Sequence, residues 1–208
     1  MVPRPRVYDL DAVLDAAESL AADAGPAGVT TRAVAAAAGV SNGAIYHNFG
    51  SRAELVAHTW LRAGRRFLDV QTELVDAVLT EPVVDPVQAV VAAADAPVVF
   101  AGRWPRSGAL LLQVPRDRLL ADELPDKLTA ELDGLNHRLL ELMKRLSTTM
   151  WNRRDRAAVD AITICIVDLP TSIILSRNRI KSTWARTRLQ AAVRAVLATE
   201  PPTRRTPA

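Results

Sequence analysis

The sequence contains a single cysteine, Cys165, among its 208 residues. One cysteine excludes an intramolecular disulfide and a cysteine metal cluster, and it fits the reducing cytoplasm. With three histidines and no glycine-rich phosphate loop, the chain offers little for metal-dependent or nucleotide-dependent chemistry. No uncharged apolar run approaches the ~18 residues that a membrane span needs, and no signal peptide follows Met1. We therefore expect a cytoplasmic protein with no membrane span, catalytic site, metal or cofactor.

Strand signals are also scarce, because the chain has no Asn-Gly hairpin and no sustained alternation of apolar and polar residues. Apolar residues recur instead at the three-and-four spacing of helices. The sequence predicts an all-α protein of about nine helices. Besides two short helices within residues 29–51, their expected ranges are 9–24, 51–79, 86–100, 105–114, 125–150, one capped by Asn152 and kinked at Pro170, and 182–199.

Residues 29–51 read as two short helices joined by a tight turn. Thr30 is placed to cap the first helix, and Ser41 to cap the second, because each hydroxyl can accept a bond from an unpaired backbone N–H. Gly39 stands between them, where glycine enters the left-handed conformation at little cost. The pattern predicts a helix-turn-helix, a motif that places its second helix in the DNA major groove.

Charge is distributed unevenly along the chain. Residues 1–66 hold 7 basic and 6 acidic side chains, so affinity for DNA must come from placed contacts more than from bulk charge. Residues 177–208 hold 8 basic and 1 acidic side chain, and a solvated, disordered end is favoured there over a contact with nucleic acid. Arg4 and Arg6 lie in a proline-rich arm, which either follows the DNA or is a disordered terminus.

The arrangement of these motifs resembles the TetR family of bacterial transcriptional regulators. The resemblance rests on Thr30 to Arg32, Ala38 to Ser41, then Gly43, Ile45, Tyr46 and Phe49, and on Ser51 with Arg52, where the family usually has lysine. It implies a three-helix DNA-binding domain over residues 1–52 and a helical ligand-binding and dimerisation domain over 53–199. Residues 200–208 are expected to form a disordered tail.

The expected DNA contacts lie at the starts of the two short helices and near the end of the second. Asn42 can bond adenine through two atoms, and the methyl group of Ala44 can touch the thymine methyl. The resemblance assigns Tyr46 and His47 to phosphates, although Tyr46 could instead mainly pack. The full set is Thr30, Thr31, Arg32, Ser41, Asn42, Gly43, Ala44, Tyr46, His47 and Arg52.

The resemblance also implies that the second domain binds a small molecule. Its candidate residues are aromatic, sulfur-containing or polar side chains within helical segments, and plain core packing is the alternative for the aromatics and the methionine. Asp168 stands in an apolar segment, where it could meet a ligand amine or pair with an arginine across a dimer interface. The candidates are Phe100, Trp104, Gln113, Asn136, Met143, Trp151, Cys165 and Asp168.

The last two long helices carry more apolar and alanine surface than one face needs. We therefore expect a homodimer whose seam includes Ile162, Ile166, Ile173, Ala192 and Val196. The leading hypothesis is a repressor that binds a palindromic operator in double-stranded DNA as a dimer and is released by a small molecule. The alternatives are a small helical enzyme on the same architecture and a DNA-binding protein without an inducer.

Overall fold

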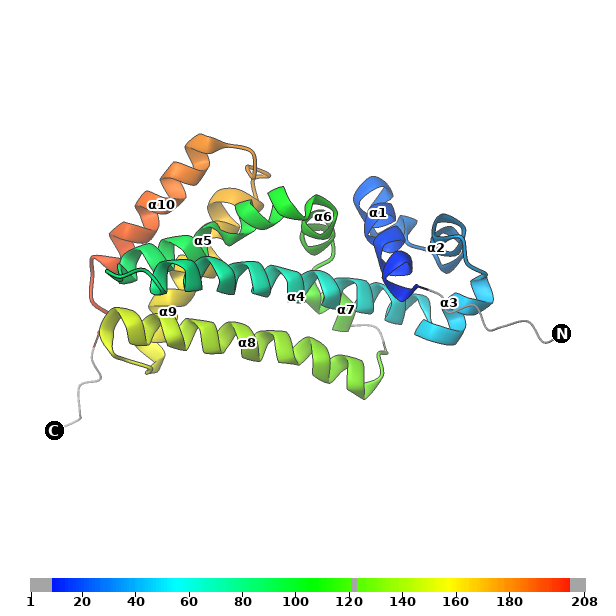
Figure 1. Cartoon of the computed structure of the whole chain (residues 1–208), viewed down its shortest axis with the longest axis horizontal. Coiled ribbons are helices and arrows are strands. Elements are labelled where there is room, and N and C mark those ends of the chain that lie inside the picture. Colours follow the sequence, from blue (N-terminus) through cyan, green and yellow to red (C-terminus); the bar gives the residue numbers. More distant parts are fainter. Residues whose placement is uncertain (1–8, 121–122, 203–208) are drawn as a thin grey trace. The chain divides into compact units, whose positions relative to one another are not determined.

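The computed structural model describes residues 9–120 and 123–202, and these residues form an all-helical protein (Figure 1). The described ranges contain ten α-helices, two π-helical segments named η1 and η2, and no strand. In chain order the elements are α1 (Leu10–Gly28), α2 (Thr31–Ala38), α3 (Asn42–Phe49), α4 (Arg52–Leu79), α5 (Pro86–Arg103), α6 (Pro105–Gln113), α7 (Arg116–Leu120), α8 (Asp126–Trp151), α9 (Arg156–Thr163), η1 (Ile164–Asp168), η2 (Thr171–Leu175) and α10 (Thr183–Leu197). The expected all-α fold class is confirmed, and the short helix α7 was not predicted.

The helices form two compact units, each assembled from two stretches of the chain. The first unit contains the chain up to Gly64 together with Trp104–Asp133, and the second contains Arg65–Arg103 and the chain from Gly134 onward. The beginning of α4 thus belongs with the first three helices, and so do α6 and α7. The boundary expected after residue 52 did not anticipate this, because these contacts join residues that are far apart in the sequence.

The core of the first unit is built around small side chains that let helices approach closely. α1 packs against α2 and α6, and α2 packs against α3. The straight part of α1 ends at Gly25, whose φ of 71° is favourable for glycine, so the expected stop at the Gly25-Pro26 pair is confirmed. The buried residues of this core are Val13, Ala17, Ala21, Val29, Val34, Ala35, Ile45, Phe49, Leu55, Val56, Ala63, Leu110, Val114 and Leu119.

The second unit has its own apolar core, in which α10 and η1 both pack against α5. An ion pair fastens α10 to α5: Arg186 donates from Nε to Asp95 Oδ1 at 2.7 Å and from Nη2 to Asp95 Oδ2. The carboxylate of Asp95 raises the pKa of the guanidinium. The apolar residues buried between these elements include Val75, Val90, Ala94, Leu142, Leu146, Ile162, Ile174, Leu189 and Val193.

A proline inside α5 is compensated by a side chain from α4. Pro97 has no N–H, so the carbonyl of Ala93, four residues earlier, lacks its helical partner. Gln71 is 1% exposed, and its Nε2 donates to that carbonyl at 3.0 Å. The amide therefore supplies the hydrogen bond that the proline removes, and α5 continues through Pro97.

The helix that follows α8 begins later than the sequence predicted. Asn152 does not cap it, because Asn152 has a φ of 52° at the end of α8. The cap is Asp155, whose Oδ1 accepts from the backbone N–H of Ala157 at 3.1 Å and of Ala158 at 3.4 Å. A hydrogen bond from Arg153 lowers the pKa of Asp155 to about 2, so the capping carboxylate stays ionised.

The segment from α9 through η2 departs from regular α-helix where Pro170 was expected to kink it. The two π-helical segments η1 and η2 flank Pro170. Pro170 has no backbone N–H, and the wider turns on either side of it accommodate the missing hydrogen bond. The most apolar 18-residue window of Arg156–Leu175 has a mean hydropathy of 1.9. By length and composition this segment is able to cross a membrane, which was not expected. The core helix of a soluble protein can have the same properties, so this is weak evidence for a span.

The end of the described chain is held in place. Pro201 is buried, and Arg153 donates to the carbonyls of Pro201 at 2.7 Å and Pro202 at 2.9 Å. Residues 200–202 are the start of the tail that was expected to be disordered, and that expectation stays a prediction. The remainder of that tail, 203–208, and the arm with Arg4 and Arg6 lie outside the described residues.

Candidate nucleic-acid interface

The helix-turn-helix forms as the cap residues predicted. Thr30 Oγ1 accepts from the N–H of Ala33 at 3.1 Å at the start of α2, and Ser41 Oγ accepts from the N–H of Ala44 at 3.1 Å at the start of α3. Between them Gly39 takes the left-handed conformation with a φ of 67°. The turn is thus fixed by two caps and one glycine, and it sets the direction of α3.

Helix α3 presents one apolar and one polar face. Ile45 is 1% exposed and Phe49 is buried beside it, so these side chains anchor α3 in the core of the first unit. Asn42, Gly43 and His47 are exposed on the other side of the helix. An exposed amide in the first turn of such a helix, and an imidazole in its last turn, can donate to base edges or phosphates.

Tyr46 links α3 to α2. Its ring is 51% exposed, and its hydroxyl oxygen accepts a long hydrogen bond, 3.4 Å, from Oγ1 of Thr31, which is buried. A phenol that accepts in this way still has its own O–H to donate. Tyr46 can therefore donate to a phosphate, whereas the Thr31 side chain mainly positions it, a role that the sequence did not indicate.

Arg52 is tied to the backbone that precedes α2. Its Nε donates to the carbonyl of Val29 and its Nη2 to the carbonyl of Pro26, both at 2.6 Å. The side chain remains exposed, so the charge is still presented beside the helix-turn-helix. Two of its donors hold the α1–α2 connection, and its expected contact with DNA stays a prediction.

A buried charged network ties α1 to α4 and α6, and the sequence analysis missed it. Arg62 of α4 donates to Glu18 Oε1 from Nε at 3.1 Å and from Nη2 at 2.9 Å, and the hydroxyl of Ser107 donates to Glu18 Oε2 at 2.7 Å. Arg62 also reaches Asp11 and Asp15 on α1. The available signal was Glu18 itself, an acid directly beside the apolar stripe of α1.

Residues 13–59 match the family model for bacterial regulatory proteins of the tetR family. The N-terminal region is a TetR-family DNA-binding domain. Comparison with curated proteins finds no match.

Solved structures of low identity share the fold. A TetR-like transcriptional regulator from Rhodococcus sp. RHA1 is 20% identical with a TM-score of 0.64, over 95% of this chain and 100% of that one. The TetR family transcriptional regulator PfmR from Thermus thermophilus is 20% identical with a TM-score of 0.58, over 89% and 97%. The fatty acid degradation regulator FadR from Bacillus halodurans is 15% identical with a TM-score of 0.61, over 91% and 97%. The architecture is that of a TetR-family transcriptional regulator.

The residues expected to bind a ligand are divided between the two units. Trp104 and Gln113 belong to the first unit with the TetR-family domain, and both are exposed. In the second unit Asn136 and Asp168 are exposed and Trp151 is half-buried. The remaining three candidates are buried in that unit: Phe100, Met143 and Cys165. Phe100 contacts the ring of Phe67 edge-on at 5.5 Å, and burial raises the pKa of the Cys165 thiol to about 12, so both fit core packing.

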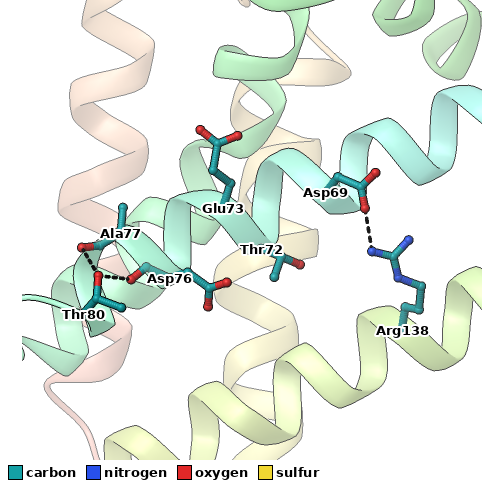
Figure 2. Close-up of a pocket in the computed structure, with 7 residues that line it drawn as sticks. All are labelled: Asp69, Thr72, Glu73, Asp76, Ala77, Thr80 and Arg138. Atoms are coloured by element: carbon teal, nitrogen blue, oxygen red, sulfur yellow. Dashed lines mark hydrogen bonds and ion pairs between the residues drawn. The ribbon is translucent and has the colours of Figure 1, made fainter.

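An open pocket lies on the second unit along α4, and none of the expected ligand residues lines it (Figure 2). Its lining includes Asp69, Glu73 and Asp76, and each of these carboxylates is paired with an arginine: Arg138, Arg103 and Arg145 respectively. The pairing with Arg103 lowers the pKa of Glu73. The carboxylates of this pocket are therefore charge-balanced, and its lining shares no residue with the expected ligand site. Within the described ranges, no group of three His, Cys, Asp or Glu residues could hold a metal ion.

Proposed function

We propose that this chain is a transcriptional repressor that binds operator DNA as a homodimer in the cytoplasm and is released by a small molecule. The observation that carries the proposal is the outward face of α3. Asn42 and His47 are exposed there, and the Tyr46 hydroxyl keeps a proton to donate. Such a helix, held by two caps on a packed core, supplies base-reading and phosphate-binding groups on one rigid element.

The contacts divide into positioning and reading. Tyr46, Arg32 and Arg52 hold phosphates. The helix N-termini that Thr30 and Ser41 cap face the backbone of the DNA. Asn42 and Ala44 read base edges, and Gly43 lets the two backbones approach. His47 contacts a phosphate beside Tyr46.

The dimer proposal is supported by the apolar segment from α9 through η2. Only 33% of its most apolar 18-residue window is buried within one chain, although its mean hydropathy is 1.9. A second copy that covers this surface would remove it from water, and a two-fold dimer would match a palindromic operator. Of the expected seam, Ile162 and Ile166 are buried in the chain's own core, whereas Ile173, Ala192 and Val196 are half-buried and can meet a second copy.

Release by a ligand is supported by the course of α4. This helix supplies residues to both units, so a ligand that shifts its part in the second unit must also shift the helix-turn-helix. A coupling free energy of about 1–3 kcal/mol between the two sites would suffice for induction. Since the expected ligand residues are divided between the two units, a DNA-binding protein without an inducer is the second candidate.

Selection of bound sequences from random DNA tests the proposal. We expect enrichment of a palindrome, with binding that weakens steeply as salt rises because phosphates release counterions. Failure to enrich any motif, with no binding at low salt, would contradict it. Once the operator is known, metabolites that release the DNA would separate the repressor with an inducer from the second candidate.

A further inference from the structure

The basic stretch near the end of the sequence begins inside the described structure. Residues 177–208 hold 8 basic side chains, and six of these lie within 177–202. No acidic residue occurs between Asp168 and Glu200, so the stretch has no compensating charge of its own. The proposed function uses none of these cations. The first unit offers DNA little net attraction, since residues 1–66 hold 7 basic and 6 acidic side chains.

Three of these cations lie in the turn that joins η2 to α10 (Figure 1). Backbone hydrogen bonds fix this turn: the N–H of Arg179 donates to the carbonyl of Ile174 at 2.8 Å, and the N–H of Ser182 donates to the carbonyl of Arg179 at 2.9 Å. Arg177, Arg179 and Lys181 are exposed on it, and we call these three residues the basic turn. Three positive charges are thus held within at most ~14 Å of chain.

The cations of the basic turn are not used within the chain. In the described ranges, the side chains of Arg177, Arg179 and Lys181 form no ion pair or hydrogen bond. Arg186, a few residues later, is by contrast paired with Asp95. Cations held this close repel one another, and an anion that lies against them relieves the repulsion. The basic turn is therefore a surface that favours an anionic partner.

The residues beside the basic turn favour a phosphate backbone over a lipid surface. Ser176, Asn178 and Thr183 are exposed there. Hydroxyl and amide groups, together with arginine and lysine, are the side chains that bind DNA phosphates. Among residues 176–188 Trp184 is the one large apolar side chain that is exposed. A segment that lies in a membrane surface presents a whole apolar face instead.

We propose that the basic turn binds the phosphate backbone of duplex DNA without regard to sequence. Duplex DNA carries a negative charge every ~1.7 Å along its axis, so three cations held in one turn can meet several phosphates at once. This contact is separate from α3, and it needs neither an operator nor an inducer, so it goes beyond the proposed function. It supplies the net attraction for DNA that the first unit lacks.

Binding of the full-length chain to a short duplex of scrambled sequence tests the contact, by fluorescence anisotropy over a salt series. The combined variant Arg177→Gln, Arg179→Gln and Lys181→Gln removes the three cations. Each phosphate contact contributes about 0.9 to the slope of the logarithm of the binding constant against the logarithm of salt. The slope should therefore become shallower by about two to three units for each chain bound, and affinity at low salt should fall about tenfold or more.

A matched control removes the same charges from another part of the chain. Arg106, Arg118 and Lys127 are exposed in the first unit and comprise, like the basic turn, two arginines and one lysine. Arg106→Gln, Arg118→Gln and Lys127→Gln combined lower the net charge equally, and the slope should change by less than about one unit. Arg177→Lys combined with Arg179→Lys keeps the charges and should keep the wild-type slope.

A basic-turn variant whose slope equals that of the wild type or of the matched control would overturn the inference. So would an unchanged slope in a variant that no longer floats with phosphatidylglycerol vesicles although the wild type does, which would assign the turn to a membrane surface. If the combined variant does not fold by circular dichroism, Arg177→Gln and Lys181→Gln alone, each expected to reduce the slope by about one unit, decide the matter. The DNA is scrambled, so the comparison stays decisive even where random-sequence selection enriches no motif and the proposed operator recognition fails.

Discussion

The two units of this protein share a buried ion pair but differ in the surfaces that they expose. The first unit buries a carboxylate, Glu18, and pairs it with Arg62 and Ser107, while its exposed helix α3 is polar. The second unit also buries a carboxylate, Asp95, and pairs it with Arg186, but only 33% of the most apolar window of its α9–η2 segment is buried. A polar exposed face suits a polyanion, and an apolar exposed face suits another protein surface. The difference indicates that the surfaces of the two units suit different kinds of partner.

The largest effect expected from this comparison concerns the buried pair of the first unit. Arg62→Ala removes the cation that faces the buried Glu18 carboxylate, and should lower the free energy of unfolding by about 3 kcal/mol. Arg145→Ala breaks an exposed pair with Asp76 in the second unit and should cost less than about 1 kcal/mol. Urea unfolding followed by circular dichroism measures both losses of stability. Equal losses would mean that the buried pair of the first unit contributes no more to stability than the exposed pair of the second.

A smaller effect is expected at the proline of the second unit. Gln71→Leu leaves the Ala93 carbonyl without a donor in the core and should cost about 1–2 kcal/mol. In a Pro97→Ala background the backbone N–H returns to that carbonyl, so the same substitution should cost clearly less. A cost that is unchanged by Pro97→Ala, in the same urea experiment, would show that Gln71 acts through packing instead of through this hydrogen bond.

Within the first unit, Arg52 allows charge to be separated from geometry. Arg52→Lys keeps the positive charge but cannot hold the Val29 and Pro26 carbonyls together in the same fork. We expect operator affinity to fall about threefold to fivefold with an unchanged salt dependence, measured by fluorescence anisotropy over a salt series. Arg52→Ala is the control, and its salt slope should be shallower by about one unit. A lysine variant with wild-type affinity would show that the fork is dispensable.

The smallest effect is expected at Cys165. Burial raises the pKa of its thiol to about 12, so at pH 8 the nucleophilic thiolate is scarcely populated. A thiol reagent should therefore modify the native chain very slowly at pH 8 and modify the urea-unfolded chain quickly. Rapid labelling of the folded chain would place Cys165 at an open site and reopen its role in ligand binding.

Local sequence signals predicted the parts of the fold that local chemistry decides. Thr30 and Ser41 are predicted as caps, and each accepts the expected backbone N–H. Asp85 and Ser182, which directly precede or begin two of the predicted ranges, cap their helices in the same way. The prediction was wrong at Asn152, because two polar candidates lie three residues apart and only the chain's path after α8 selects Asp155. Periodicity at 162, 166 and 173 marked the apolar side of a helix without saying whether the chain itself or a second copy covers it.

The candidate DNA-binding site was predictable from the sequence to the same extent as the fold. Residues on α3 could be assigned to the DNA-facing side because the caps fix its direction. The Thr31–Tyr46 contact, the Arg52 fork and the Glu18–Arg62–Ser107 network could not be read, because each joins residues 15 or more positions apart. The ligand candidates, which are divided between the two units, show that residue types alone do not predict where a pocket forms.

The central claim, that α3 reads operator bases, is tested most directly at Asn42. Asn42 is exposed at the start of α3, and Asn42→Ala removes its amide without disturbing the Ser41 cap. Random-sequence selection should be run in parallel with the wild type, Asn42→Ala and Tyr46→Phe. We predict that Asn42→Ala weakens binding to the best site by about 1–3 kcal/mol and loses the preference at one base pair of each half-site. Tyr46→Phe should bind all sequences more weakly with its preferences intact. Full base preference in Asn42→Ala, with altered preference in Tyr46→Phe, would contradict the account.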